Sequence, residues 1–319
     1  MSISQIDSKK EGICMSLFQG AATALITPFR DGKPDYEALE QLIDFQLRNN
    51  IDAIVSCGTT GEASTLSLED QIQVVQFTIE KVNRRVPVIA GAGSNDTQVA
   101  LTKAKAMEYA GADGILMVTP YYNKCSQKGL IQHYTYIADQ LKSPLILYSV
   151  ASRTGVNITP ETVGILARHP NICGIKEASG NISQIVEISK YVNESFALYS
   201  GNDDQVIPIM SMGGSGVIST CGNIVPDIMH QMTQAWIDGD IKTAAGLQRE
   251  YKTLIDALFC EVNPIPVKAA LYLMEMIHLE YRLPLCPPSE ATMKRLNEMM
   301  TQYGLIEPDS NHTSSYDKK

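Results

Sequence analysis

The chain has 319 residues, of which 44% are hydrophobic and 19% are charged. This composition is typical of a folded globular protein and excludes a disordered chain or a fibre. The formal net charge is −9, and no cluster of Lys and Arg is present, which argues against nucleic acid as a partner. The sequence contains no run of 18 or more apolar residues, the length needed to span a bilayer, so we expect no membrane association.

The seven cysteines are odd in number and scattered, with no Cys-x-x-Cys pair and no histidine at zinc-ligand spacing. We therefore expect reduced thiols, no metal site and a cytoplasmic location. Residues 1–15 are polar and lack the apolar run of a signal peptide. We predict that they form a flexible extension, with the true start at Met1 or Met15, and that residues 306–319 form a flexible tail.

From Ala21 onward, short runs of β-branched and apolar residues alternate with longer segments of helical periodicity. This alternation is typical of repeated βα units around a parallel sheet. The predicted strands are 21–27, 53–57, 86–91, 114–120, 144–150, 172–178, 197–201 and 215–220. The predicted helices between them are 35–49, 68–84, 97–110, 127–141, 160–168, 181–191, 203–212 and 225–238. Eight strands in sequence favour closure into a TIM (β/α)8 barrel over an open sheet.

The strand pattern stops after residue 240. The remaining periodic segments, 240–260, 264–278 and 289–303, predict three helices packed against one side of the barrel. No low-complexity linker separates the two parts. We therefore predict one structural domain, with the barrel over 16–239 and a C-terminal helical extension over 240–305.

In a barrel of this kind, functional residues lie where the strands end, because the following loops converge on one pocket. The residues at predicted strand ends that could carry chemistry are Thr59 and Thr60 after strand 2, Tyr121 and Tyr122 after strand 4, Tyr148 in strand 5, Lys176 in strand 6 and Gly201 after strand 7.

Lys176 is the most informative of these residues. It follows Ile172 and Gly174 in period-two register, so the three side chains are expected on one face of the strand, which in a small barrel could be the interior. A buried amine is desolvated, which lowers its pKa and leaves part of it free to attack a ketone. For a single lysine, a side chain that extends to solvent is the more common situation.

The neighbouring polar residues strengthen the catalytic interpretation. The phenol of Tyr148 could relay protons, and Thr59 and Tyr122 could extend that relay. The turn at Thr59 and Thr60 offers hydroxyls and backbone N–H groups to a small carboxylate, and Arg153 could bind a second carboxylate. A packed tyrosine, a capping turn and a surface salt bridge are the simpler explanations. No Gly-rich phosphate motif of the GxGxxG or Walker type is present.

Taken together, these segments resemble the pyruvate-dependent aldolase family that contains dihydrodipicolinate synthase and N-acetylneuraminate lyase. The resemblance spans about residues 20–305. Its motifs occur in the family's order: ALITPF, VSCGTTGEASTL, VIAGAGSN, VTPYYN, ILYSVASRTG, GIKEASGN, LYSGND, GGSGVIS and NPIPVKAAL. The doubled Thr of GTTGE, the Tyr pair of TPYYN, the SRTG run and NPIPVK indicate the synthase branch.

The resemblance implies a role for each candidate residue. The roles are Lys176 as the Schiff-base lysine; Tyr148, Thr59 and Tyr122 as a proton relay, with Tyr122 crossing from a neighbouring subunit; Thr60 with Thr59 at the pyruvate carboxylate; Arg153 at the carboxylate of L-aspartate 4-semialdehyde; and Gly201 and Ile218 as pocket lining. The implied reaction condenses pyruvate with that aldehyde to 4-hydroxy-tetrahydrodipicolinate, in lysine and diaminopimelate biosynthesis. The resemblance further implies a lyase without a cofactor that assembles as a homotetramer, a dimer of tight dimers.

Two departures from the family pattern leave other functions open. Ser149 and Ala151 replace Asn and Pro, so the loop that holds Arg153 loses a stiffening ring. Asn202 stands where the family commonly has an acidic residue. The nearest alternative is another aldolase of the family that acts on a sugar-derived or hydroxylated 2-keto acid. An alternative of another class is a barrel that binds a small acid without turnover.

A lysine feedback site is matched only in part. Asn95 and Tyr121 are kept, whereas Leu68, Gln71 and Val99 stand where inhibited relatives commonly carry two His and a Glu. Without that carboxylate the site has less to hold an ammonium group, so we predict weak or absent lysine inhibition. Initial rates measured over a range of lysine concentrations test this prediction, and potent inhibition at micromolar lysine would refute it.

Overall fold

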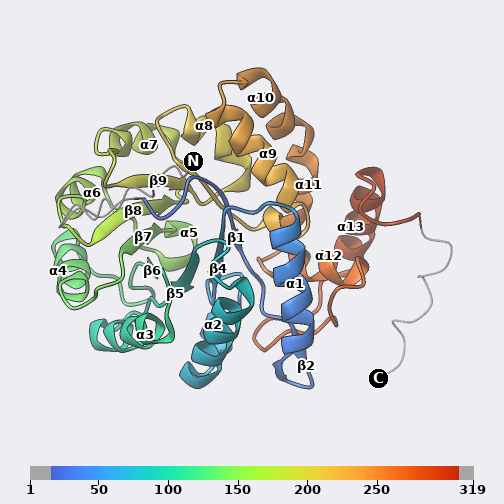
Figure 1. The fold of residues 1–319 in the computed structure, drawn as a ribbon, viewed down its shortest axis with the longest axis horizontal. Coiled ribbons are helices and arrows are strands. Elements are labelled where there is room, and N and C mark those ends of the chain that lie inside the picture. The colour runs from blue at the N-terminus through green and yellow to red at the C-terminus, as the bar shows by residue number, and fades with distance from the viewer. Residues whose placement is uncertain (1–15, 309–319) are drawn as a thin grey trace, which may run out of the picture.

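Eight parallel strands form a closed barrel, in the order β1-β10-β9-β8-β7-β6-β5-β4 (Figure 1). The strands are β1 (Gly20–Ala24), β4 (Ala53–Ser56), β5 (Val88–Gly91), β6 (Gly114–Val118), β7 (Leu145–Ser149), β8 (Ile172–Glu177), β9 (Ala197–Ser200) and β10 (Gly216–Ser219). The predicted TIM barrel is confirmed. The computed structural model describes residues 16–308, so the predicted extension 1–15 and all but the first three residues of the predicted tail 306–319 lie outside the described residues.

Helices surround the barrel, and their starts follow the local sequence. They are α1 (Tyr36–Arg48), α2 (Leu68–Val82), α3 (Thr97–Ala110), α4 (Gln127–Ala138), α6 (Pro160–Leu166), α7 (Ile182–Ser189), α8 (Val206–Met210) and α9 (Pro226–Ile237). The Ser67 side chain accepts from the Asp70 backbone N–H to cap α2, and Thr159 caps α6 ahead of Pro160. The sequence analysis did not predict the β2 (Phe29–Arg30) and β3 (Lys33–Pro34) hairpin or the one-turn helix α5 (Ala151–Thr154).

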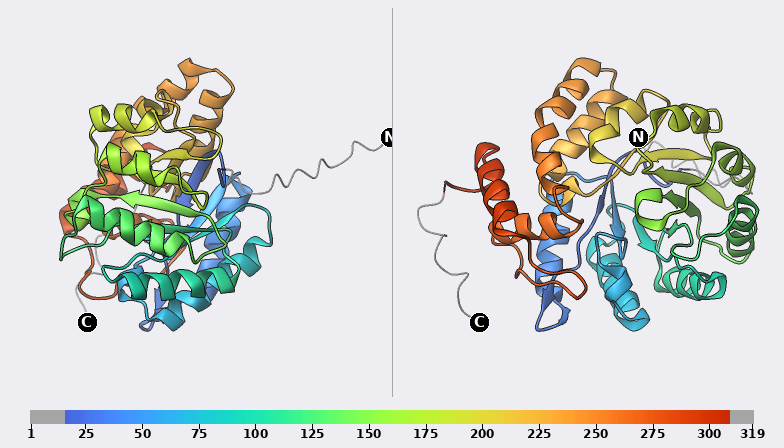
Figure 2. Two further views of the ribbon diagram at one scale, coloured as in Figure 1. Left: turned by 90° about the vertical axis from the view of Figure 1, so that its left-hand side faces the viewer. Right: turned by 180° about the vertical axis from the view of Figure 1, so that it is seen from behind.

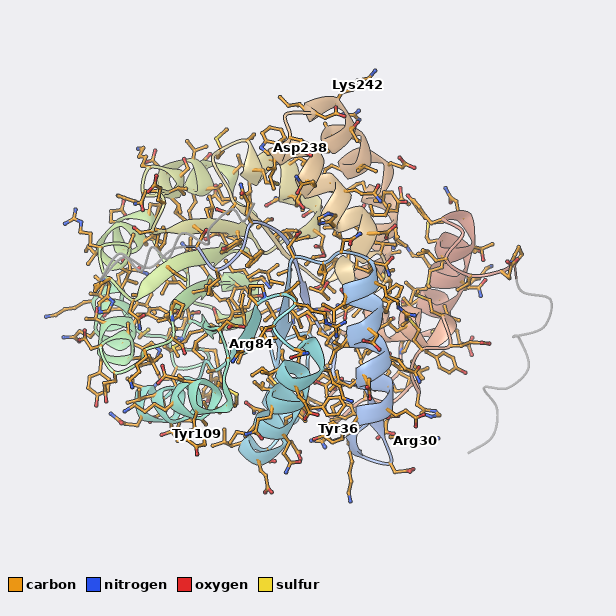
Figure 3. The ribbon with its side chains drawn as sticks, viewed as in Figure 1. Arg30, Tyr36, Arg84, Tyr109, Asp238 and Lys242 are labelled. Carbon is orange, nitrogen blue, oxygen red and sulfur yellow. The ribbon has the colours of Figure 1, made fainter. Side chains whose placement is uncertain are left out.

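The C-terminal region holds four helices in its described part, where three were predicted. They are α10 (Ile241–Glu250), α11 (Lys252–Leu258), α12 (Ile265–Leu273) and α13 (Glu290–Gln302). Tyr251 ends α10 and begins α11, so one periodic segment holds two helices. Figures 1 and 2 show α12 and α13 on the side of the barrel that α1 occupies, and Figure 3 shows Lys242 projecting from the start of α10. None of the helices within residues 16–308 is long and apolar enough to cross a membrane.

Two clusters of buried hydrophobic residues separate the inside of the barrel from its outer layer. The inner cluster comes mainly from the strands, with residues such as Ile89, Leu116 and Ile146. The larger cluster contains strand and helix residues together, so it lies between the strands and the surrounding helices. Side chains of one strand therefore alternate between the two clusters, and their position along the strand decides which cluster they join.

A register shift in the pairing of β7 with β8 changes this alternation near Lys176. Ile172 belongs to the outer cluster, and the next residue, Cys173, belongs to the inner one. The prediction that Ile172 shares the face of Lys176 is therefore wrong, because one extra residue is inserted before Gly174. Gly174 and Lys176 keep the period-two relation and face the interior, since their partners on β7 belong to the inner cluster.

The close approach of β4 and β5 at Gly91 makes a testable prediction about stability. A Cβ on Gly91 would lie 2.1 Å from the Cys57 carbonyl oxygen, whereas a Cβ on Gly246 in α10 would meet nothing within 4 Å. We expect Gly91→Ala to lower the free energy of unfolding by about 1–3 kcal/mol. The matched change Gly246→Ala should raise it by about 0.5–1 kcal/mol, because alanine favours the helix. Urea unfolding of both variants measures the difference, and equal effects would contradict the packing described at Gly91.

Candidate active site

A cavity of about 150 Å³ opens at the carboxyl-terminal ends of the barrel strands. It is lined by Ala24, Val55, Gly58, Thr59, Thr60, Leu116, Tyr148, Val150, Ser152, Arg153, Lys176, Ala178, Gly201, Asn202, Thr220, Phe259 and Asn263. Strand ends far apart in the sequence thus bring six predicted site residues to one pocket. Those six are Thr59, Thr60, Tyr148, Arg153, Lys176 and Gly201.

Lys176 is held on β8 between two tyrosines of the adjacent strands. Its Cα pairs with that of Tyr148 on β7 and with that of Tyr199 on β9. The residue is only 6% exposed, and its Nζ lies 4.5 Å from the centroid of the Tyr148 ring. Burial lowers the pKa of Lys176 to about 8, and the nearby charges of Asp203 and Arg153 raise and lower it, respectively. About a tenth of this amine is therefore unprotonated at pH 7, and the fraction rises with pH.

Tyr148 presents a protonated phenol to the same pocket. Burial raises the pKa of its hydroxyl, and the positive charge of Arg153 and a hydrogen bond with the Thr59 side chain partly offset that rise. The ring is almost fully buried in the inner cluster. Tyr148 can therefore donate a proton to, and recover it from, a group bound beside Lys176.

The chain after β4 forms a turn at residues 59–62, called the threonine turn. Side chains from distant parts of the chain fix this turn. Thr60 is buried, and its hydroxyl accepts a hydrogen bond of 2.9 Å from Asn263 and lies 3.4 Å from the Thr220 hydroxyl. The Thr27 hydroxyl donates to the carbonyl of Gly61 at 2.7 Å. The turn thus places hydroxyls and backbone groups at the pocket wall with little freedom to move.

Arg153 lies in α5, directly after β7. The buried Ser149 hydroxyl accepts from the Ile158 backbone N–H at 3.2 Å, which ties the end of β7 to the chain beyond the loop. The Thr154 hydroxyl donates to the Val156 carbonyl at 3.0 Å. These hydrogen bonds hold the loop that carries Ser149, Ala151 and Arg153.

The remaining predicted residues lie elsewhere. Tyr122 is 89% exposed in a left-handed conformation, with φ 69°. It lines a neighbouring cavity of about 680 Å³ together with Tyr121, and this cavity shares Thr59, Tyr148 and Arg153 with the pocket. Ile218 is buried in the inner cluster and is not among the residues that line the pocket. Asn95 is exposed and lines neither cavity.

Sequence reasoning missed Thr220, Phe259 and Asn263 as lining residues. Asn263 stands in the NPIPVK segment, which marked the family without being assigned a role. No group of three or more His, Cys, Asp or Glu side chains within residues 16–308 is placed to hold a metal ion.

The fold and the pocket define a (β/α)8 barrel with a buried lysine amine of lowered pKa at the carboxyl-terminal mouth of the barrel. The chain belongs to the dihydrodipicolinate synthetase family, whose model matches residues 17–303.

Known relatives match over nearly their whole length. The chain is 51% identical to a 4-hydroxy-tetrahydrodipicolinate synthase of Alkaliphilus oremlandii, over 91% of this chain and 100% of the relative. It is 49% identical to the enzyme of that name from Geobacter sulfurreducens, with the same coverage. Among solved structures, the dihydrodipicolinate synthase of Thermotoga maritima superposes with a TM-score of 0.90 at 42% identity, covering 91% of this chain and 100% of that one. The resemblance to the family is thereby confirmed.

The lowered pKa of Lys176 makes a prediction that needs no substrate. Carbamylation by cyanate requires the free amine, so its rate at Lys176 should rise with pH around a midpoint of about 8. An ordinary exposed lysine titrates near pH ~10.4. Asp203→Asn should move the midpoint down, because it removes an anion that favours the ammonium form, and Arg153→Gln should move it up. Peptide mass spectrometry over a pH series measures these rates, and an ordinary lysine midpoint at Lys176 would contradict its burial.

Proposed function

We propose that the chain condenses pyruvate with L-aspartate 4-semialdehyde through a Schiff base on Lys176, giving 4-hydroxy-tetrahydrodipicolinate for lysine and diaminopimelate biosynthesis. The observation that carries the proposal is the buried Lys176 amine, which faces a small pocket beside the Tyr148 ring. The names of the relatives, which match over almost their full length, support the choice of reaction.

The first half of the proposed reaction activates pyruvate. The free amine of Lys176 attacks the keto carbon, the resulting oxygen takes one proton from the amine and one from the phenol of Tyr148, and water leaves to form an iminium. The Tyr148 phenolate then removes a proton from the methyl carbon, which gives an enamine and restores the phenol. Thr59 and Thr60 hold the pyruvate carboxylate in this scheme, and Gly201 leaves room for the substrate at the pocket wall.

The second half joins the two substrates. The enamine carbon attacks the aldehyde carbon, and the phenol of Tyr148 protonates the oxygen that becomes the product hydroxyl. The amine of the second substrate then attacks the iminium carbon, which releases Lys176 and closes the six-membered ring. Arg153 binds the carboxylate of the second substrate, because a guanidinium can hold a carboxylate with two hydrogen bonds.

We further propose that Tyr122 serves the pocket of a neighbouring subunit, in a homotetramer built as a dimer of tight dimers. The side chain is almost fully exposed in this chain and yet held in a rare backbone conformation, which supports a role outside its own pocket. One solved relative, 41% identical with a TM-score of 0.90 over 91% of this chain and 98% of that one, is described as a monomeric variant, a description that belongs to that protein. We propose a cytoplasmic location on the composition and scattered thiols of the chain.

The expected lysine insensitivity gains support from the side chains at the partial feedback site. The Gln71 amide donates to the carbonyls of Ala63 and Leu66, so it is already engaged. Val99 is half exposed and offers no acceptor.

Trapping of the Schiff base tests the proposed chemistry. Borohydride with pyruvate should add the mass of a reduced pyruvate adduct to the peptide that contains Lys176, and Lys176→Ala should abolish both the adduct and turnover. Tyr148→Phe should keep the adduct and lower kcat by roughly 10²-fold or more, because it removes the proton donor. Mass spectrometry and a coupled assay measure the two effects. The proposal fails if Lys176→Ala retains turnover or if the unaltered chain forms no adduct.

Complementation between inactive variants tests the shared site. Tyr122→Phe and Lys176→Ala should each be nearly inactive alone, since each lacks one part of every pocket. When equal amounts of the two are unfolded together and refolded, about half of the dimers should be mixed and hold one intact pocket of two, so the mixture should show about a quarter of the unaltered activity. No recovery in dimers shown to be mixed would contradict the crossing of Tyr122.

A further inference from the structure

The NPIPVK segment connects the C-terminal helices to the threonine turn through buried charges. Lys268 in α12 and Glu62, two residues after Thr60, form an ion pair with Nζ and Oε1 2.6 Å apart. Both side chains have no exposed surface. Residues more than 200 positions apart in the sequence thus meet next to the wall of the pocket.

The carboxylate of Glu62 is held at both oxygens by the C-terminal region. Oε1 accepts from Lys268, and Oε2 accepts from the backbone N–H of Arg282 at 3.2 Å. Glu62 itself adopts a left-handed conformation, with φ 52°. A residue other than glycine occupies this region at a cost, so surrounding contacts must maintain it.

Aromatic rings complete the surroundings of Lys268. Its Nζ lies 4.3 Å from the ring centroid of Phe29 and 5.0 Å from that of Tyr281. The Tyr281 hydroxyl in turn donates to the Ile265 carbonyl at 2.8 Å. The ammonium group therefore has one carboxylate and two ring faces as partners, which fixes its position closely.

The threonine turn is held at three consecutive residues. Asn263 donates to the Thr60 hydroxyl, Thr27 donates to the Gly61 carbonyl, and Lys268 pairs with Glu62. Two of these three contacts come from the NPIPVK segment. Since Thr60 and Thr59 line the pocket, the segment determines where its hydroxyls and N–H groups stand.

We propose that the Lys268–Glu62 ion pair is a positioning device, which sets the threonine turn for the carboxylate of the keto acid that binds at Lys176. This inference rests on the proposed function. Glu62 and Lys268 are positioning residues, because they line neither of the two cavities and act through the turn. A buried ion pair commonly adds little to stability compared with apolar residues of similar volume, so its value here lies in fixing one geometry.

The test removes both charges together. Glu62→Gln combined with Lys268→Met removes both charges and keeps the volumes similar. Either change alone would leave one buried charge uncompensated. The matched control is Lys252→Met with Asp256→Asn, which removes an exposed ion pair from α11. The milder variant Glu62→Asp keeps the charge and shortens the side chain by one methylene, so it serves if the double variant fails to fold.

The measurement is the pyruvate concentration that half-saturates borohydride trapping on Lys176 in folded protein. We expect this concentration to rise about tenfold in the double variant and about threefold in Glu62→Asp, with the KM of the aldehyde substrate and kcat changing much less. The control should match the unaltered chain. If the ion pair only stabilised the fold, the double variant would have a lower unfolding temperature, but its half-saturating pyruvate concentration would not rise more than the KM of the aldehyde.

The outcomes separate this inference from the proposed function. If the unaltered chain is trapped but the half-saturating pyruvate concentration is unchanged in both the double variant and Glu62→Asp, the positioning role alone is overturned. A complete lack of trapping in the unaltered chain overturns the proposed function itself.

Discussion

The desolvation of one amine is the constraint on which the rest of the site depends. Lys176 is buried at a strand end, beside the Tyr148 ring, where water cannot fully stabilise its charged form. The barrel makes this possible because strands pair on both sides of β8 and supply the walls of the pocket. The opposing charges of Asp203 and Arg153 then adjust the pKa around the value that burial sets.

The C-terminal region, with its helices and the segments between them, is part of the site as well as an addition to the barrel. Asn263 reaches the pocket wall, and Lys268 and Arg282 together hold both oxygens of Glu62. The barrel strands supply the amine and the phenol, whereas the C-terminal region helps to fix the turn that faces them. In the proposed reaction, catalytic chemistry and carboxylate recognition are thus anchored in different parts of the chain.

Much of this architecture could be predicted from the sequence, because periodicity and capping residues act locally. The strands and the caps at Ser67 and Thr159 follow from such local patterns. The shift near Cys173 could not be predicted, since one inserted residue leaves an apolar run unchanged. The ion pair of Glu62 with Lys268 could not be predicted either, because the two residues are 206 positions apart and only the tertiary fold brings them together.

A crystal soaked in pyruvate and examined at high resolution gives the most direct test of the central claim. The account predicts continuous electron density from Nζ of Lys176 to the keto carbon, with the pyruvate carboxylate at the Thr59 and Thr60 turn. An unmodified Lys176 side chain turned away from the pocket, with pyruvate absent or bound elsewhere, would contradict it.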